Sequence, residues 1–474
     1  MKINANITAM RANLKLNTVQ KRLTDSTTKM SSGYRINKAA DDAAGMAISQ
    51  KMHSQIRGLM RASRNGSDGI SFIQTAEGAL TEIENILQRC RELSVQAAND
   101  VNTLQDKQAI QEEIDSLRDE IDRLSKQTEY NTMSVLDGSC CRQSTSSNVG
   151  VKLISASDDV GLATYTFSVD QAATQATLET GALNISSSET VSEEAAGKIQ
   201  INGEVIEVKE GETYEDVYAR IRDYCEMMNI DVAPVDGSGE EAELDSATSL
   251  KFTSVLYGSS QSITVTTDNG ELATKLGIDG ATSTPGQDAE VTLDTDDSGF
   301  AKTATVFCDG DRVEVTDRGG FKMIFDVSSA EAPSDASVTM LDAGYIKVQI
   351  GANEGQTVNI SVPSVSAKAL HIENCNICTH EGASSAITSF DDAIEQISAV
   401  RAKLGAYQNR LDSSVSSLDV SSENLTEACS RIEDVDMSEE MTRYTQYSVL
   451  VQAGTSMLAH ANNQPQTILQ LLQG

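Results

Sequence analysis

Residues 390–432, FDDAIEQISAVRAKLGAYQNRLDSSVSSLDVSSENLTEACSRI, carry an apolar residue at every seventh position. A heptad pattern sustained over this length predicts a long helix that packs against a partner helix along its apolar seam. One row of the pattern is Phe390, Ile397, Leu404, Leu411, Leu418, Leu425 and Ile432, and a companion row contains Ile394, Val415 and Cys429.

A partner for this helix is present near the other end of the chain. Residues 70–95 and 110–124 also place apolar side chains at helical spacings. Residues 1–233 and 364–464 contain no proline, so both ends permit long helices. We therefore expect the two ends to pair in one antiparallel or mixed bundle, although an ordinary helical bundle fits the pattern too. The apolar positions of 70–95 are Ile73, Leu80, Leu87, Ile83, Ile86 and Leu93.

The middle of the chain, residues 140–343, differs in composition. It is rich in Val, Thr, Ser, Gly and Asp, and it contains alternating stretches such as 198–201 and 313–316. Turn sequences at 202–203, 268–270 and 309–310 separate such stretches, which predicts a β-rich region. The segment has 37 acidic and 12 basic residues, so it carries −25 of the total net charge of −33. We expect a solvent-facing β domain inserted between helical ends.

The overall composition excludes several classes of protein. A 474-residue chain with a net charge of −33 offers no basic surface for nucleic acid. No apolar run of 18 residues is present, so no membrane-spanning segment is expected. The first residues, MKINANITAM, lack the apolar core of a secretory signal. The sequence therefore predicts either a cytosolic protein or export without a cleaved signal.

Both extreme ends form a third zone of short amphipathic patterns. Isolated helices are marginal in water, so we expect residues 1–30 and 445–474 to be disordered in a monomer. Their apolar faces need a cover, either a membrane surface or further copies of the chain. Residues 445–474 contain no Lys or Arg, which favours copies of the chain. The apolar positions are Ile3, Ile7, Met10 and Leu14 at one end and Val449, Leu450, Ala453, Met457, Leu458, Ile468, Leu469, Leu471 and Leu472 at the other.

Several motifs at both ends are similar to those of bacterial flagellins. The N-terminal ones are SSGYRIN (31–37) with DDAAG (41–45), ASRNGSDGIS (62–71), TAEGAL (75–80) and QRCRELSVQ (88–96). The C-terminal ones are LGAYQNRL (404–411), SRIED (430–434) and QAGTSML (452–458). They occur in the family's order and cover about residues 1–139 and 344–474. In addition, GKIQING (197–203) resembles a repeat of flagellin and hook-associated outer domains.

The resemblance implies a domain plan. Residues 1–43 with 440–474 would form the innermost terminal helices (D0), and residues 44–139 with 344–439 a surrounding helical bundle with a β-hairpin (D1). Residues 140–343 would be the variable outer domain, which leaves D1 near Ser139 and returns near Gly344. Small and polar residues would connect D0 to D1 and permit a bend there, although a plain helix–loop–helix joint is the alternative. The connector residues are Gly33, Arg35, Asp41, Asp42 and Gly45.

The resemblance also implies partners and a location. The chain would be a structural subunit that assembles with itself into an extracellular flagellar filament for swimming. An export chaperone would hold the C-terminal helix, whereas the filament cap and hook-associated proteins would contact the polymer. An innate immune Toll-like receptor would dock at positions that match Arg89, Leu93 and Glu113. These three residues could instead serve contacts between subunits or the surface of the bundle.

No enzyme motif is present, and we expect neither catalysis nor a cofactor. His371, Cys375, Cys378 and His380 could hold zinc in principle. However, the four residues lie within ten positions, which is cramped for a zinc finger, so free thiols or a Cys375–Cys378 disulfide are favoured over a metal site. Sequons at Asn65, Asn184, Asn359 and Asn424 are frequent by chance.

Two other functions are compatible with the sequence. A hook–filament junction protein shares the terminal plan, but it usually has Pro after the paired aspartates, where this chain has Ala43. A coiled-coil surface adhesin with a β head would need a signal or an anchor, and neither is visible in the sequence.

Overall fold

The computed structural model describes residues 6–99, 101–148, 150–157, 160–237, 239–294, 299–327, 334–341 and 343–473. The chain divides into two compact units, which are described separately. Unit 1 comprises Met1–Gly69, Val348–Val358 and Arg410–Gly474, and unit 2 comprises Ile70–Lys347 and Asn359–Asn409.

Long helices form both ends of the chain, as the heptad pattern predicts. The prediction of mainly helical ends around a β-rich insertion is confirmed, and residues 390–432 fall within one helix. The helices are α1 (Ile7–Ser32), α2 (Ala43–Ala97), α3 (Leu104–Gln127), α4 (Tyr214–Met227), α5 (Gly270–Leu276), α6 (His380–Glu433) and α7 (Met437–Gln473), with a 3₁₀ turn η1 (Ile278–Gly280).

The helical core of unit 2 consists of α3 and the portions of α2 and α6 that belong to this unit. Ile73, Leu80 and Leu87 of α2 have no exposed surface, and Phe390 and Leu404 of α6 are equally buried. Arg401 of α6 forms an ion pair with Glu84 of α2 beside this core. The predicted apolar rows therefore meet in a closed seam, which removes their surface from water.

Unit 1 contains α1, α7 and the remaining parts of α2 and α6. The apolar row of α6 is buried at Leu411 but only half-buried at Leu418 and Leu425. The tip of the hairpin between β18 (Ile346–Gln349) and β19 (Thr357–Ile360) packs on α2, where the Asn65 side-chain amide donates to the Gln349 carbonyl oxygen at 3.2 Å.

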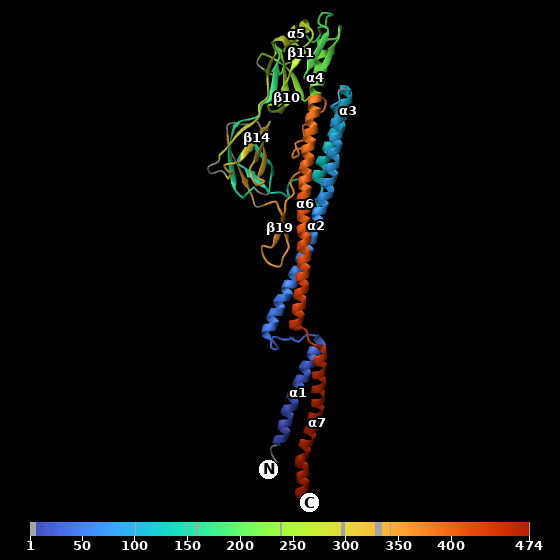
Figure 1. The fold of residues 1–474 in the computed structure, drawn as a ribbon, viewed down its shortest axis with the longest axis vertical. Helices are drawn as coiled ribbons and strands as arrows, with labels where there is room; N and C mark the ends of the chain where they lie inside the picture. Colours follow the sequence, from blue (N-terminus) through green and yellow to red (C-terminus); the bar gives the residue numbers. More distant parts are fainter. Residues whose placement is uncertain are drawn as a thin grey trace. The chain divides into compact units, whose positions relative to one another are not determined.

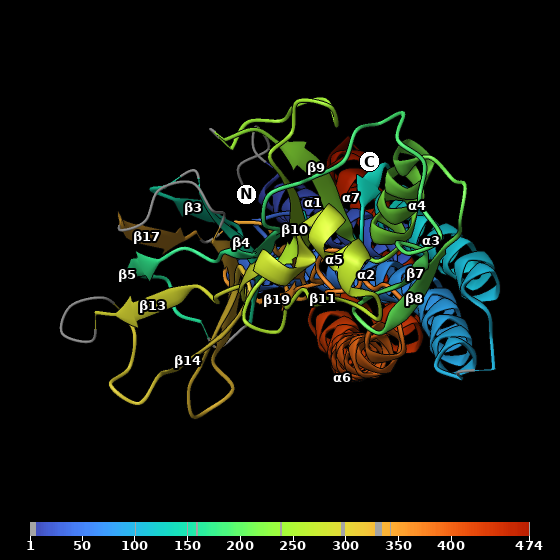
Figure 2. The ribbon, with the colours of Figure 1, turned by 90° about the horizontal axis from the view of Figure 1, so that it is seen from above.

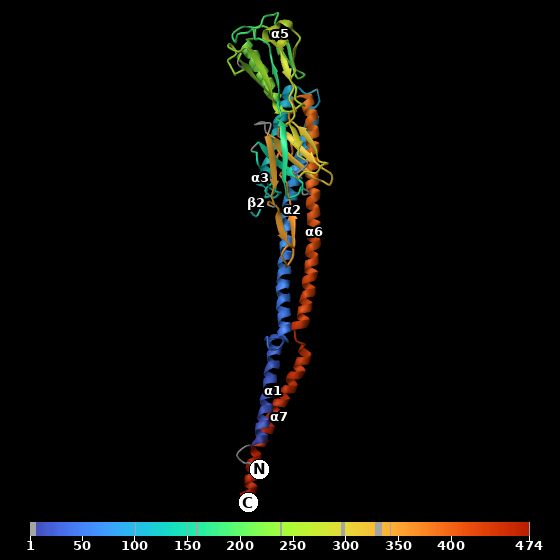
Figure 3. The same cartoon turned by 90° about the vertical axis from the view of Figure 1, so that its left-hand side faces the viewer.

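The two terminal helices differ from their predicted disorder. Residues 7–32 and 437–473 are helical, and α1 packs against α7 (Figures 1 and 3). The physical reason is that each helix finds a partner within the same chain, so one face of each is shielded without any second copy.

The predicted β-rich middle is confirmed, and it holds two hydrophobic cores in unit 2. The first core lies between two four-stranded sheets, β13-β5-β17-β3 and β14-β15-β16-β4. The second core unites the sheets β12-β6-β10-β9 and β11-β7-β8 with α4 and α5 (Figure 2). Because its strands lie between β5 and β13 in sequence, the second core is an insertion within the first.

The strands of these sheets and of the β1–β2 hairpin are short and antiparallel. Their bounds are β1 (Glu129–Tyr130), β2 (Met133–Ser134), β3 (Ser144–Ser146), β4 (Val151–Ala156), β5 (Thr164–Gln171), β6 (Gln175–Glu179), β7 (Gly197–Ile201), β8 (Glu204–Val208), β9 (Ile230–Val235), β10 (Ser249–Tyr257), β11 (Val265–Thr267), β12 (Thr282–Thr284), β13 (Glu290–Leu293), β14 (Thr305–Asp309), β15 (Arg312–Thr316), β16 (Lys322–Val327) and β17 (Ser334–Met340).

Candidate assembly surfaces

The contact between α1 and α7 is made by half-buried side chains and one glycine. Leu16 of α1 lies over Gly454 of α7, where a Cβ would come within 3.1 Å of the Leu16 Cδ1 atom. At the other end of α1, the Asn6 side-chain amide donates to the Ala461 carbonyl oxygen at 2.8 Å. Further half-buried positions on these helices are Ala9, Ala12, Val19, Leu23, Tyr447, Val451 and Leu458.

A second apolar stripe on these helices stays uncovered. Ile7, Met10 and Leu14 of α1 are 58–66% exposed, and Leu450 of α7 is 44% exposed. Val449 and Met457 are exposed in the same way. Of the predicted assembly residues, Leu458 alone among the described side chains is half-buried, whereas Ile3 and the side chains of Leu469 and Leu472 lie outside the described residues. The predicted residues therefore present an apolar face that the monomer does not cover.

The connector between α1 and α2 is a hydrogen-bonded joint. Gly33 ends α1 in the left-handed conformation at φ 77°, which favours glycine. Its carbonyl oxygen accepts from the Val435 N–H at 3.0 Å, and the Arg35 N–H donates to the Glu433 carbonyl oxygen at 2.7 Å. The Arg35 guanidinium also donates to the Ile432 carbonyl oxygen. The segment that links α1 to α2 is thus hydrogen-bonded to the segment that links α6 to α7.

The paired aspartates build the second half of the connector. Asp41 accepts from the Asn37 and Lys38 N–H groups at 3.0 and 2.9 Å, and the bonds from Lys38 and Asn37 lower the pKa of this carboxyl. Asp42 accepts from the Gly45 N–H at 2.9 Å in the first turn of α2. A Cβ at Gly45 would lie 2.5 Å from an Asp42 side-chain oxygen, so a larger residue there would displace the Asp42 side chain that accepts from this turn.

The three residues predicted to contact a receptor or another subunit differ in exposure: Arg89 and Glu113 are exposed, and Leu93 is buried. The Arg89 guanidinium on α2 pairs with the Glu113 carboxylate on α3 at 2.9 Å, and both side chains are about half exposed. This hydrogen bond to Glu113 raises the pKa of Arg89. Leu93 differs from the expectation of a surface contact, because it is 2% exposed and belongs to the helical core. Arg89 and Glu113 alone of the three offer a surface.

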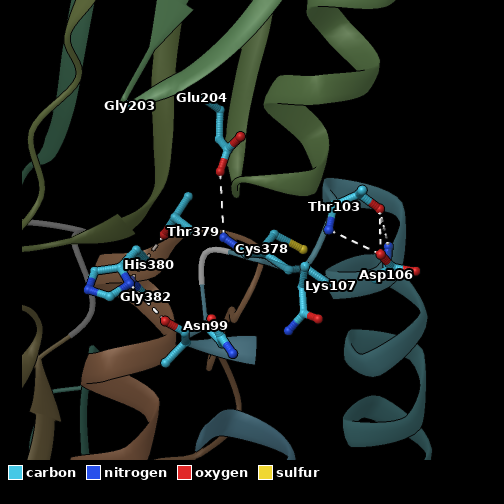
Figure 4. A network of polar contacts seen from close by, with 12 residues as sticks. Asn99, Thr103, Asp106, Lys107, Gly203, Glu204, Cys378, Thr379, His380 and Gly382 are labelled. Atoms are coloured by element: carbon cyan, nitrogen blue, oxygen red, sulfur yellow. Dashed lines mark hydrogen bonds and ion pairs between the residues drawn. The ribbon is translucent and has the colours of Figure 1, made fainter. Parts of the chain in front are cut away.

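The second of the two β cores of unit 2, named here the inner β core, contacts the beginnings of α3 and α6 (Figure 4). The Lys107 ammonium, whose side chain is 5% exposed, lies 3.7 Å from the Glu204 carboxylate at the start of β8. Thr103 and Asp106 form a capping box that fixes the first turn of α3. The Asn376 side-chain amide donates to the Met227 carbonyl oxygen at 2.6 Å. An ion pair with a buried lysine and a half-buried glutamate, together with one side-chain-to-backbone hydrogen bond, therefore forms this contact, and neither interaction is visible as a sequence motif.

Comparison with known proteins assigns the chain to a family. Residues 3–140 match the bacterial flagellin N-terminal helical region, and residues 387–472 match the bacterial flagellin C-terminal helical region. A flagellin of Clostridium tyrobutyricum is 36% identical over 466 residues, which cover 98% of this chain and all of the relative.

The chain belongs to the flagellin family.

Other relatives agree with this assignment. A flagellin of Salmonella typhimurium is 32% identical over 99% of both chains. A solved flagellar hook-associated protein-3 of Legionella pneumophila aligns with 82% of this chain and 98% of its own, at 13% identity and a TM-score of 0.31, which is too low to support any argument. Family membership makes the chain a structural subunit of the flagellar filament. In the described part of the chain, no helix has the length and apolar character that a membrane span needs.

The histidine and cysteine residues of this flagellin do not form the zinc site considered at 371–380. His371 lies near Asp309, and His380 bonds to the Ala98 carbonyl oxygen instead. Cys375 and Cys378 are free thiols, and burial raises the pKa of each to about 11. Among the described residues, the group of potential ligands that converges is His53, Cys429 and Glu433. Sequence reasoning missed this group because its two parts are 376 residues apart.

The sequons lie in different surroundings. Asn184, Asn359 and Asn424 are exposed, whereas Asn65 is half-buried and its amide donates to the hairpin at Gln349. Asn65 is therefore the least accessible of the four to a modifying enzyme.

Proposed function

We propose that this flagellin polymerises through its terminal helices into the extracellular filament that propels a swimming cell. The observation that carries the proposal is the uncovered apolar stripe on α1 and α7. A stripe that stays exposed after the two helices have paired needs a further partner to leave water.

A second copy of the chain is the partner that fits this stripe best. Residues 445–474 contain no Lys or Arg, so a membrane surface, which favours basic helices, is a poor match for the α7 part of the stripe. Identical copies would bring the same apolar residues together repeatedly, and a head-to-tail contact that does not close forms a helical polymer. In this proposal residues 1–43 and 440–474 form the inner layer, and 44–139 with 344–439 the next layer.

The proposal includes partners that act before and after polymerisation. Before assembly, the C-terminal apolar face would stay exposed, so a chaperone with an apolar groove would cover it. Assembly would then bury the same face, with the hook-associated proteins at the base and the cap at the tip. Folding and assembly would be coupled through this shared surface.

Electron microscopy of purified, seeded monomer tests the proposal. The full chain should form long uniform tubes, and a variant lacking residues 450–474 should stay monomeric. The truncated chain should retain the circular dichroism of unit 2, because none of that unit's residues is removed. Full-length chains that only cap the ends of other filaments would identify a junction protein instead.

We further propose that an innate immune Toll-like receptor recognises the monomer at Arg89 and Glu113. The pair is exposed on α2 and α3, and its charges can exchange partners with a receptor surface. Leu93 supports the patch from inside the core. Assembly would cover this surface if the receptor and a neighbouring subunit used the same residues.

A comparison of receptor signalling by monomer and by crosslinked filament tests whether the receptor and a neighbouring subunit use the same residues. Monomer should signal and crosslinked filament should not, and Arg89→Ala should weaken monomer signalling. Arg123→Ala is the matched control, because Arg123 also forms an exposed ion pair, with Glu120 of the same helix. Equal signalling by monomer and crosslinked filament would contradict the proposal.

A further inference from the structure

Three side chains of different chemistry converge beside the connector in unit 1. His53 projects from α2, and Cys429 and Glu433 lie one helical turn apart near the end of α6. The His53 Nε2 atom lies 2.7 Å from a Glu433 carboxylate oxygen and 3.5 Å from the Cys429 sulfur. The sulfur lies 3.6 Å from the same Glu433 oxygen. The three potential ligand atoms thus form a small triangle.

The triangle has nearly the dimensions of one face of a zinc tetrahedron. Bond lengths of about 2.3 Å to sulfur and about 2.1 Å to nitrogen and oxygen give tetrahedral edges of about 3.6 Å from sulfur and about 3.4 Å between nitrogen and oxygen. The two edges from the Cys429 sulfur already have these lengths. The edge between His53 and Glu433 is shorter at 2.7 Å, so a bound ion would have to separate these two side-chain atoms by about 0.7 Å.

The burial of the three residues suits an ion with one open position. Cys429 is 3% exposed, whereas 45% of the His53 side chain and 20% of the Glu433 side chain face solvent. Solvent therefore reaches the group from the side of the histidine, where a water could complete four ligands. A mixed sulfur, nitrogen and oxygen set favours Zn²⁺ or Co²⁺ over Mg²⁺ or Ca²⁺, which prefer oxygen alone.

We propose that His53, Cys429 and Glu433 form a binding site for a divalent transition metal, with Zn²⁺ as its ion. Binding releases the thiol proton of Cys429 to solvent and leaves a thiolate ligand. The site ties α2 to the last turn of α6. Because the Glu433 carbonyl oxygen holds the Arg35 N–H, the ion also braces the connector that follows α1.

Cobalt titration of the full-length, reduced monomer tests the site, since Co²⁺ reports sulfur ligation by a charge-transfer absorption. The unmodified chain should bind one equivalent with this absorption, and Zn²⁺ should displace it. Cys429→Ser should abolish the band, and His53→Gln should weaken binding at least about tenfold. Cys225→Ser is the matched control, because Cys225 is a buried thiol in the inner β core and should leave the titration unchanged.

Two outcomes would overturn the proposal. The first is a titration without any charge-transfer band, which would leave an ordinary His53–Glu433 ion pair beside a packed thiol. The second is a band that persists in Cys429→Ser, which would place the metal on other cysteines. Since nearly half of the His53 side chain faces solvent, His53→Gln should fold even if the serine variant does not, and circular dichroism of both variants checks this.

Discussion

Two helical pairs of the molecule bury their apolar residues differently. One is α1 with α7 in unit 1, and the other consists of the portions of α2 and α6 that belong to unit 2. In unit 2, Leu80 and Leu404 lose all contact with solvent. In unit 1, Leu16 rests on a glycine, and larger residues such as Met10 and Leu14 stay exposed. One pair closes its own core, whereas the other only half-buries the side chains at its contact and leaves a second apolar stripe outside it. This difference is the one expected under the proposal that other copies of the chain cover the terminal pair.

Removing the exposed stripe should have the largest effect. Met10→Ser with Leu14→Ser should abolish filament formation, because both side chains lie outside the intramolecular contact and their burial would depend on neighbouring copies. Helix content by circular dichroism should not change. Val205→Ser, which replaces an exposed apolar residue on β8, should still give filaments in the electron microscope. If the double variant still formed filaments, the exposed stripe on α1 would not be needed for assembly, and the proposed difference between the two helical pairs would be wrong.

Creating a cavity in the helical core of unit 2 should instead lower the stability of the monomer. Leu404→Ala should lower the free energy of unfolding of unit 2 by about 2–5 kcal/mol, since it leaves a cavity among fully buried side chains. Val95→Ala on α2, where the side chain is half exposed, should change it by less than about 0.5 kcal/mol. Urea denaturation of the two variants measures both values. Similar losses would mean that burial does not distinguish these positions.

The connector predicts a smaller effect that depends on backbone conformation. Gly33→Ala should destabilise the joint by about 1–2 kcal/mol, because a Cβ is unfavourable in the left-handed conformation. Gly78→Ala in α2 should do the opposite and stabilise by about 0.5–1 kcal/mol, since its Cβ meets open space in a helix. Thermal melting of the two alanine variants should therefore shift in opposite directions.

The smallest effect concerns the pH dependence of the connector. The pKa of Asp41 is lower in the folded chain than in the unfolded one, so its hydrogen bonds stabilise the joint at pH values above its ordinary pKa of about 4. This contribution is lost as the pH falls through the lowered value. Hydrogen exchange at the Asn37 and Lys38 amides should accelerate there relative to other amides. Asp41→Asn should remove the pH dependence, and an unchanged profile would contradict this role.

Residue patterns alone determined the helical ends, the β-rich middle and the motifs that indicate a flagellin. Periodicity is sufficient for these because Leu80, Leu404 and the alternating strands follow the spacing of their own local structure. The same patterns singled out Met10, Leu14 and the glycines of the connector, but they did not show which face of a terminal helix meets its partner.

Tertiary structure decided the contacts between residues that are distant in sequence. It placed Leu93 in the core, Lys107 opposite Glu204, and His53 beside Cys429 and Glu433. It also turned Leu16 of α1 onto Gly454 of α7, so that the helices expected to be disordered formed a pair. The physical reason is that a side chain's neighbours across two helices depend on their packing and register, which local spacing does not specify.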